Sequence, residues 1–238
     1  MRDVRIAVVI TMYNEVDVVN FNLSRLDHHA KDIYICRSTN KRTKQFDDLE
    51  VPDRLKDDQH LFTRPNLGGR TNQYELPAKS VTRNYSELFS AIRHRSDIDW
   101  VVAATGDTQL WHLMGVRNVI AMMQDLDFDV ACNKAIGQHM HSADKTLAQI
   151  EAGEHGGRRQ TLEVADMMPQ LFIVRHREVQ KRGLFCNIEI TNKWCTEQCL
   201  GDAFLSSGLS LERQHVMSKT AYGFTMGVRY NAHQGDTV

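Results

Sequence analysis

The sequence predicts an α/β domain with a mostly parallel sheet and helices on both faces of that sheet. Two apolar runs carry the prediction: residues 6–10, Ile-Ala-Val-Val-Ile, and residues 100–104, Trp-Val-Val-Ala-Ala. Neither run alternates polar with apolar residues, which is typical of central strands covered on both faces. After the first run, apolar residues recur every three or four positions, as in an amphipathic helix that packs on a sheet.

Length and charge narrow the class of protein. A chain of 238 residues can form one substantial core, so we predict a single domain over residues 1–238. The formal net charge of -1 argues against a general nucleic-acid-binding surface. No run approaches the roughly 20 apolar residues of a membrane span, and the charged N-terminus lacks the apolar core of a signal peptide.

The five cysteines, at positions 36, 132, 186, 195 and 199, show no C-x-x-C spacing. The single C-x-x-x-C pair, Cys195 and Cys199, is predicted to pack on one helix face rather than to bind a metal. Because an odd number of thiols without a pairing pattern favours a reducing compartment, we expect a cytoplasmic protein.

The first strand ends in a polar corner, residues 11–15, Thr-Met-Tyr-Asn-Glu. In open α/β sheets, ligands bind beyond the carboxyl ends of the strands, where this corner would lie. An ordinary corner is the alternative, because Asn14 is a good helix N-cap and Glu15 is favoured by the helix dipole.

The strand, the Thr-x-Tyr-Asn-Glu corner and the helix together resemble the opening of nucleotide-sugar glycosyltransferases of the GT-A fold, family 2 type. In that family the corner lies against the base and ribose of the sugar nucleotide. The resemblance implies that Thr11, Tyr13, Asn14 and Glu15 bind the nucleotide sugar. It also implies a nucleotide-binding half over about residues 1–110 and an acceptor half over about residues 111–238.

Further strands are predicted at residues 32–36 and 60–63, with a weakly structured surface excursion at residues 41–59 between them. Many family members carry an acidic residue after the second strand to read the base. This chain has Arg37 and Ser38 there, so base recognition does not follow from the resemblance.

A glycine turn precedes the next helix. Residues 66–69, Asn-Leu-Gly-Gly, are followed by apolar residues at helical spacing from position 81 to 92. The turn resembles that of the family, which implies that Gly68 lies beside the ligand. Arg83 would pair with a diphosphate through its planar fork, and residues 71–79 would cover the donor pocket. An ordinary turn with solvated arginines is the alternative.

The second buried run ends in Gly106-Asp107. In the family, the corresponding strand ends in Asp-x-Asp or a shortened version, whose carboxylate holds a divalent cation that bridges the sugar-nucleotide phosphates. The resemblance implies that Gly106 and Asp107 bind the nucleotide sugar and that Asp107 holds Mn²⁺ or Mg²⁺. Thr105 replaces the first acid, which leaves strict metal dependence open.

Two other acidic stretches fit the Asp-x-Asp pattern better than residues 105–107. Residues 97–99, Asp-Ile-Asp, come just before the run at 100–104, and residues 125–129, Asp-Leu-Asp-Phe-Asp, precede a predicted strand at 130–136. Both stretches would lie at the amino ends of strands, which is the wrong edge of a parallel sheet for a ligand. Asp107 is therefore preferred.

In the second half, the polar region at residues 137–165 is predicted to be a mobile loop over the donor, and residues 169–174 to form a strand. The family has an acid at the start of the next helix, which implies that Glu197 is the catalytic base that deprotonates the acceptor hydroxyl in inverting transfer. A plain helix-start glutamate is the alternative, Asp202 is a rival, and retaining transfer would remove this role from Glu197.

The tail offers a second metal ligand. Some family members place a late histidine on the metal, which implies this role for His233, although a solvated histidine is the alternative. Residues 222–227 suggest a closing loop or a short strand pair near the site.

Together these features predict a glycosyltransferase that moves a sugar from a nucleoside-diphosphate sugar to a hydroxyl of a glycan, a lipid or another acceptor. A sugar-nucleotide nucleotidyltransferase would share the fold, but it is expected to carry a glycine-rich loop after the first strand, and residues 11–15 have no glycine. A non-catalytic nucleotide-binding or sugar-binding module is the third possibility, favoured by the missing second acid. The sequence identifies neither the sugar nor the base nor the acceptor.

Overall fold

The computed structural model describes residues 4–26, 32–39, 46–67, 75–110, 113–134, 167–190, 196–210, 213–216 and 224–225. Its strands are, in chain order, β1 (Ile6–Met12), β2 (Asp32–Thr39), β3 (Leu61–Pro65), β4 (Trp100–Thr105), β5 (Gln109–Leu110), β6 (Val130–Lys134), β7 (Met167–Arg175), β8 (Gln214–Val216) and β9 (Phe224–Thr225). Its helices are α1 (Val16–Leu26), the short 3-10 helix η1 (Asp53–Leu55), α2 (Glu75–Ile92), α3 (Leu113–Asp125), α5 (His176–Arg182) and α6 (Thr196–Ser206).

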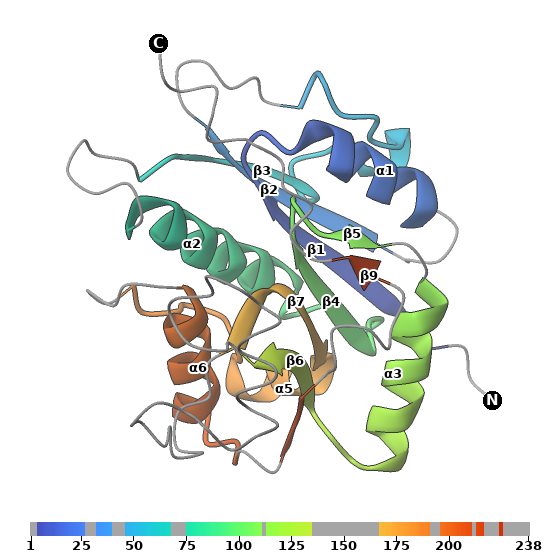
Figure 1. The fold of residues 1–238 in the computed structure, drawn as a ribbon, viewed down its shortest axis with the longest axis vertical. Coiled ribbons are helices and arrows are strands. Elements are labelled where there is room, and N and C mark those ends of the chain that lie inside the picture. Colours follow the sequence, from blue (N-terminus) through green and yellow to red (C-terminus); the bar gives the residue numbers. More distant parts are fainter. Residues whose placement is uncertain are drawn as a thin grey trace, which may run out of the picture.

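Within the described residues, seven strands form one sheet in the order β3-β2-β1-β4-β7-β6-β8 (Figure 1). β1 is parallel to β2 and β4, β2 is parallel to β3, and β6 is parallel to β8. β7 runs antiparallel to both of its neighbours, β4 and β6. All strands of this sheet except β7 therefore point the same way, and the predicted α/β class with a mostly parallel sheet is confirmed.

The two apolar runs form the middle of the sheet. Every residue of β1 is buried, and so is every residue of β4 except its last. The register pairs Ile6 with Trp100 and Thr11 with Thr105, so the two strands end side by side. The chain continues from β1 to β2 on one side while β4 lies on the other. The boundary between β1 and β4 is therefore the topological switch point of the sheet.

Helices cover both faces of the sheet, as predicted (Figure 1). On one face, α1 contributes Leu23 and α3 contributes Ile120 to a buried apolar cluster. On the other face, α2 contributes Phe89 and α6 contributes Phe204. Phe89 stacks on Phe172 of β7 with 5.9 Å between the ring centroids. Both faces of the central strands are thus covered by apolar side chains, which is why polar and apolar residues do not alternate in their sequences.

The segment between β2 and β3 is more firmly packed than expected for a surface excursion. Leu49, Val51 and Leu55 join the apolar cluster on the α1 face. Asn20 of α1 binds the segment as well, because its amide accepts from the Glu50 N–H at 2.8 Å. The sequence shows no periodicity here because the three apolar residues anchor a segment that is irregular except for the single turn of η1.

Several other expectations concern segments near the carboxyl edge. β5 pairs with β9, with Gln109 opposite Thr225, so residues 224–225, within the stretch 222–227, form one strand of a short pair whose other strand follows β4. α2 begins at Glu75, so residues 75–79 are helical rather than an irregular cover. Residues 71–74 and the loop predicted at 137–165 lie outside the described residues.

The described cysteines are free thiols, and three of them, Cys36, Cys132 and Cys199, are buried. Burial raises the pKa of the Cys36 thiol to about 12, so this side chain stays protonated. Cys199 is part of α6 and packs in the core, whereas Cys195, its predicted neighbour on the same helix face, lies outside the described residues.

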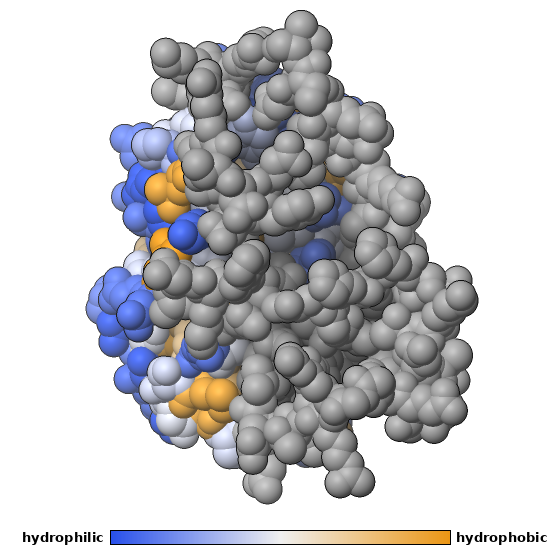
Figure 2. Space-filling model, turned by 60° about the vertical axis from the view of Figure 1, so that its left-hand side comes forward, coloured by the Kyte–Doolittle hydropathy of each residue, from blue (hydrophilic) through white to orange (hydrophobic). Residues whose placement is uncertain are grey.

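The surface of the described part of the chain shows no membrane-spanning element. None of the described helices is long and apolar enough to cross a membrane. On the coloured part of the face in Figure 2, hydrophilic and hydrophobic residues are interspersed.

A cluster of ion pairs joins β6, β7 and β8 at the amino edge of the sheet. Asp129 is 2% exposed and accepts from Arg213 Nε at 2.7 Å and from Arg177 Nη2 at 3.0 Å. Arg213 and Arg175 also pair with the exposed Asp127. The two carboxylates raise the pKa of Arg213 through these bonds. The cluster cross-links the edge and keeps its charges paired.

We expect His176 to make stability depend on pH. His176 is fully buried, with Nε2 2.8 Å from the Ile92 carbonyl oxygen. Burial lowers its pKa below the usual 6.5. Below pH 6.5 the unfolded chain therefore binds a proton that the folded chain excludes, so this contribution is complete above pH 6.5 and falls as pH decreases toward the folded pKa.

The variant His176→Gln removes the titrating ring and tests this expectation. Urea unfolding at pH 8 and pH 5 should show a smaller loss of stability on acidification for the variant than for the natural protein. Equal losses in the two proteins would show that another group causes the acid sensitivity.

Candidate functional site

The corners that follow β1 and β4 meet at the carboxyl edge of the sheet. Thr11 and Thr105 are paired in register, and the Gly106 N–H donates to the Thr11 carbonyl oxygen at 2.7 Å. The parallel pairing therefore continues one residue past β4 and brings Asp107 to the same edge as residues 13–15. Thr11, Tyr13, Asn14, Glu15, Gly106 and Asp107 thus share one edge of the sheet.

The corner after β1 is held by the side chain of Glu15. The Tyr13 N–H donates to Glu15 Oε2 at 2.6 Å, while the Glu15 carbonyl oxygen accepts the helical bond from Val19 at 3.0 Å. Glu15 thus starts α1 and turns its carboxylate back onto the preceding backbone. Glu15, which the sequence predicts to bind the ligand, thus also fixes the backbone of the corner through its hydrogen bond with the Tyr13 N–H.

Gly106 is required by the close approach of Glu15. A Cβ atom at position 106 would lie 2.9 Å from Glu15 Oε2 and 2.9 Å from the Met12 Cβ. The Met12 Cβ is fixed to the backbone of β1, so it cannot move aside. Contact between the two corners is therefore possible only with glycine here.

We expect Gly106→Ala to destabilise the fold by about 1–3 kcal/mol, because the added methyl group overpacks the corner. It should also displace the Glu15 carboxylate and weaken ligand binding at this edge. Thermal unfolding and nucleotide titration measure the two effects. An alanine variant as stable as the natural protein would contradict the tight contact.

Asp107 lies among hydroxyl groups at the end of β4. The Thr105 hydroxyl donates to Asp107 Oδ1 and lies 3.2 Å from the Thr108 hydroxyl, which donates to the Gln170 carbonyl oxygen of β7 at 2.8 Å. Tyr85 of α2 interacts electrostatically with this carboxylate. Burial is the larger cause, and the negative charge of Asp107 the smaller one, of a pKa of the Tyr85 phenol well above 10. Thr105 stands where the family that the sequence resembles has the first acid of its Asp-x-Asp pattern. Here its hydroxyl gives Asp107 a hydrogen-bond donor.

A buried amide underlies the same edge. Asn84 of α2 is 1% exposed, and its Nδ2 donates to the hydroxyls of Thr11 and Ser38 at 3.3 and 2.9 Å and to the Cys36 carbonyl oxygen at 3.4 Å. The carbonyl accepts only, which fixes the orientation of the amide. Sequence reasoning missed Asn84 because a single asparagine in an amphipathic helix has no distinctive spacing.

Arg83 lies beside the ends of β2 and β3 rather than at the β1–β4 boundary. Its Nη2 donates to the Pro65 carbonyl oxygen at 2.6 Å, and burial lowers its pKa. Its buried Nε has no hydrogen-bond partner among the described residues. The neighbouring Arg64 is bound to Glu87 at 2.8 Å.

Glu197 lies in the first turn of α6, as expected from the sequence. The other end of α6 is beside α5, because Arg182 Nη1 donates to the Ser207 carbonyl oxygen at 3.0 Å. Since α5 follows β7 at the amino edge, the last turn of α6 lies near that edge, and the helix extends for about 16 Å between its first and last turns. The first turn of α6, which contains Glu197, is therefore the end of the helix farther from the amino edge, and Asp202 lies nearer to that edge.

Two predicted site residues, Gly68 and His233, lie outside the described residues. Among the described residues no three His, Cys, Asp or Glu side chains form a group suited to a metal ion. The donors that do surround Asp107 are oxygens. Gln170 of β7, whose carbonyl oxygen accepts from the Thr108 hydroxyl, has a buried Oε1 with no hydrogen-bond partner among the described residues. A carboxylate beside hydroxyl oxygens suits Mg²⁺ or Mn²⁺ rather than a softer metal.

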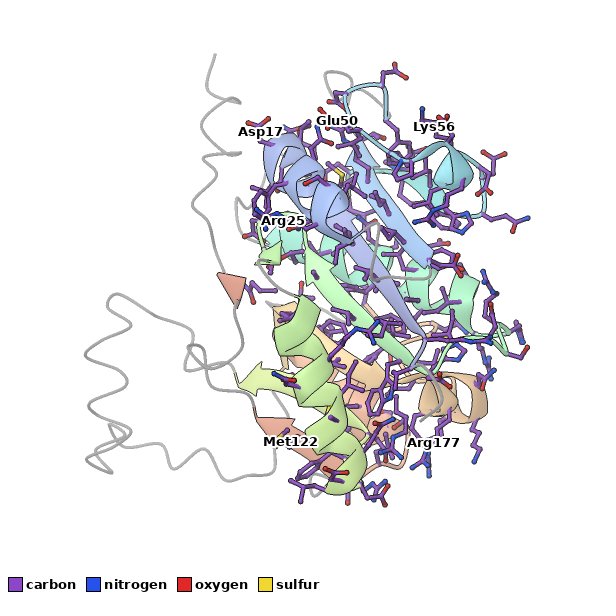
Figure 3. All side chains as sticks on the ribbon, turned by 90° about the vertical axis from the view of Figure 1, so that its right-hand side faces the viewer. Asp17, Arg25, Glu50, Lys56, Met122 and Arg177 are labelled. Atoms are coloured by element: carbon purple, nitrogen blue, oxygen red, sulfur yellow. The ribbon has the colours of Figure 1, made fainter. Side chains whose placement is uncertain are left out.

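The two alternative acidic stretches lie at the amino edge, as predicted. Asp99 Oδ2 accepts from the Arg5 N–H at 3.0 Å, ahead of β1 and β4. Asp127 and Asp129 belong to the ion-pair cluster at the same edge. Figure 3 shows Arg177 of that cluster and Asp17, in the first turn of α1, at opposite ends of the molecule.

A cavity of about 430 Å³ also lies at the amino edge, lined by Asp99, Trp100 and Arg175 among others. The Arg175 guanidinium stacks over the Trp100 ring at 5.1 Å and pairs with Asp127 and Asp129. These charges are compensated within the protein, and the cavity is on the edge opposite the β1–β4 boundary.

Comparisons with known proteins give similarity in structure only. No protein-family model and no curated protein sequence matches the chain. Among solved structures, the chain is similar to xyloside xylosyltransferase 1 from mouse, with 8% identity, a TM-score of 0.46, and coverage of 92% of this chain and 86% of that one.

It is also similar to glucosyl-3-phosphoglycerate synthase from Mycobacterium tuberculosis, with 13% identity, a TM-score of 0.48 and coverage of 97% and 74%, in a complex with Mn²⁺, UDP-glucose and phosphoglyceric acid. A mannosyltransferase from Pyrobaculum calidifontis, in complex with GDP-mannose and Mn²⁺, has 12% identity, a TM-score of 0.45 and coverage of 92% and 58%. By name, two of these three proteins transfer a sugar, a xylosyl or a mannosyl group. The fold assignment rests on the strand order and register given above.

Proposed function

We propose that the protein is a GT-A-type glycosyltransferase that moves a sugar from a nucleoside-diphosphate sugar to an acceptor hydroxyl. One observation carries the proposal. The Tyr13–Glu15 corner and Asp107 meet at the topological switch point of the sheet, joined by the 2.7 Å bond between Gly106 and Thr11. Ligands of open α/β sheets bind beyond the carboxyl ends of the strands at this point.

In this proposal, residues 1–110 bind the donor. The backbone and side chains of Thr11, Tyr13, Asn14 and Glu15 contact the nucleoside, while Gly106 leaves space for the close approach of the two corners. Asp107 and neighbouring oxygens would hold Mg²⁺ or Mn²⁺, which when bound neutralises the charge that develops on the leaving diphosphate. Gly68 and Arg83 would contact the diphosphate of the donor, and His233 would be a second metal ligand.

Residues 111–238 supply the acceptor side. Glu197 takes the proton of the acceptor hydroxyl through its carboxylate as the hydroxyl oxygen attacks the anomeric carbon, and the bond from that carbon to the diphosphate oxygen breaks, releasing the nucleoside diphosphate. The direction of α6 supports this role, since its first turn is the end of the helix farther from the amino edge. The acceptor is a glycan, a lipid or another molecule with a hydroxyl group, and the protein acts in the cytoplasm.

Calorimetric titration with a panel of nucleoside diphosphates, with and without Mn²⁺, tests the proposal, followed by an assay of donor hydrolysis. We expect one nucleotide to bind more tightly with Mn²⁺ and the matching sugar nucleotide to be hydrolysed slowly. Exchange of pyrophosphate into a sugar nucleotide would instead identify a nucleotidyltransferase. Binding without turnover would identify a non-catalytic module.

A further inference from the structure

Arg37 is a buried charge at the carboxyl edge of the sheet. It lies near the end of β2, opposite Met12 in the register with β1, and it is only 2% exposed. A guanidinium is removed from water at this depth only when protein groups satisfy its donors. The contacts of Arg37 therefore indicate what the side chain does.

The guanidinium of Arg37 joins the Tyr13 corner to the segment before η1. Its Nε donates to the Tyr13 carbonyl oxygen at 2.8 Å. Its Nη1 and Nη2 donate to the two carboxylate oxygens of Asp48 at 2.7 and 3.2 Å, a bidentate pair. Since the Tyr13 N–H already donates to Glu15, both backbone polar groups of Tyr13 are held by side chains.

Asp48 is in turn fixed to the body of the protein. Its carbonyl oxygen accepts from Asn20 Nδ2 at 3.3 Å, and the same amide binds the Glu50 N–H. The neighbouring Leu49 is buried in the core on the α1 face. The segment therefore forms a rigid support for Arg37 rather than a loose loop.

We propose that Arg37 is a positioning residue for the donor site. It fixes the backbone of Tyr13 before ligand binds, and Asp48 fixes Arg37. This inference rests on the proposed function, in which the Tyr13 corner contacts the nucleotide. We call the contacts of Arg37 with Tyr13 and Asp48 the clamp. A corner that is already ordered loses less conformational freedom on binding, so the clamp raises the affinity for nucleotide without touching the reacting atoms.

The variants Arg37→Met and Arg37→Lys test the clamp, because methionine removes the donors and lysine keeps the charge without the planar fork. Arg95→Met is the matched control: Arg95 is also bound to aspartates, Asp32 and Asp97, but on another part of the sheet. We expect Arg37→Met to weaken nucleotide binding about tenfold, raising KM and leaving kcat within about twofold. Arg37→Lys should recover only a minor part of the lost nucleotide affinity. Arg95→Met should bind nucleotide as tightly as the natural protein.

Asp48→Asn should act through the same contact. We expect it to weaken binding by about threefold on its own and to add little to Arg37→Met in the double variant. Additive effects of the two substitutions would overturn the shared clamp, and so would unchanged nucleotide affinity in Arg37→Met when the natural protein binds nucleotide.

Hydrogen exchange at the Tyr13 amide provides a readout that does not need a ligand. In Arg37→Met this amide should exchange about tenfold faster than in Arg95→Met, after correction for global stability. If the natural protein binds no nucleotide, the proposed function fails. Hydrogen exchange at the Tyr13 amide then tests by itself whether Arg37 fixes the Tyr13 backbone. Equal exchange in the two variants would overturn the clamp whether or not nucleotide binds.

Discussion

Asp107→Asn is expected to reduce sugar transfer about 100-fold to 1,000-fold, the effect of removing a preorganised charge from a site where charge develops. The substitution keeps the size of the side chain, and the asparagine oxygen can still accept from the Thr105 hydroxyl. The fold should therefore survive. Steady-state release of nucleoside diphosphate from the donor measures the first effect, and thermal unfolding measures the second.

Asp99→Asn is the matched control for this variant. Asp99 accepts a backbone hydrogen bond from Arg5, but it lies at the amino edge. We expect Asp99→Asn to retain activity within about twofold of the natural protein. If Asp107→Asn kept more than half of the activity, the carboxylate would have no part in the reaction.

The largest loss of stability is expected from Asp129→Asn, about 3 kcal/mol, because a buried carboxylate that pairs with arginines is removed. Arg213 and Arg177 donate to this carboxylate directly, at 2.7 and 3.0 Å. Without it, these guanidinium groups keep their positive charge at the amino edge with less compensation. Urea unfolding measures the change in the free energy of unfolding.

Asp127→Asn separates burial from charge in the same cluster. Asp127 pairs with the same arginines but is 64% exposed, and its φ of 54° is a left-handed conformation that asparagine adopts readily. Hydrogen bonding to Arg213 lowers the pKa of Asp127. The substitution Asp127→Asn should shift the urea midpoint of unfolding much less than Asp129→Asn. Equal shifts would show that net charge, and not the buried contacts, stabilises this edge.

The sheet could be predicted from the sequence because its central strands are buried on both faces. The apolar runs at residues 6–10 and 100–104 contain no polar position, and this is sufficient to locate β1 and β4. The antiparallel direction of β7 could not be predicted, since a strand buried on both faces has the same composition in either direction. The packing of Leu49 and Val51 was also missed, because an irregular segment has no period to detect.

The candidate site was predictable where it follows directly from strand order. Residues that end adjacent parallel strands share an edge, so placing Tyr13 and Asp107 together required only the two strands. Asn84 and the Arg37–Asp48 pair were missed because their contacts join residues far apart in the sequence. Arg37 was recognised only as a departure from the acid of the family, and its partner at position 48 has no marker in the sequence. Glu197 remains a prediction.

The most direct test of the account is a crystal structure of the protein with the nucleoside diphosphate that binds most tightly, grown with Mn²⁺. We expect the nucleotide to lie beyond the carboxyl ends of β1 and β4, with the nucleoside against Tyr13 and the diphosphate on the side of Asp107. A nucleotide bound at the amino edge, beside Trp100 and Arg175, would contradict this expectation.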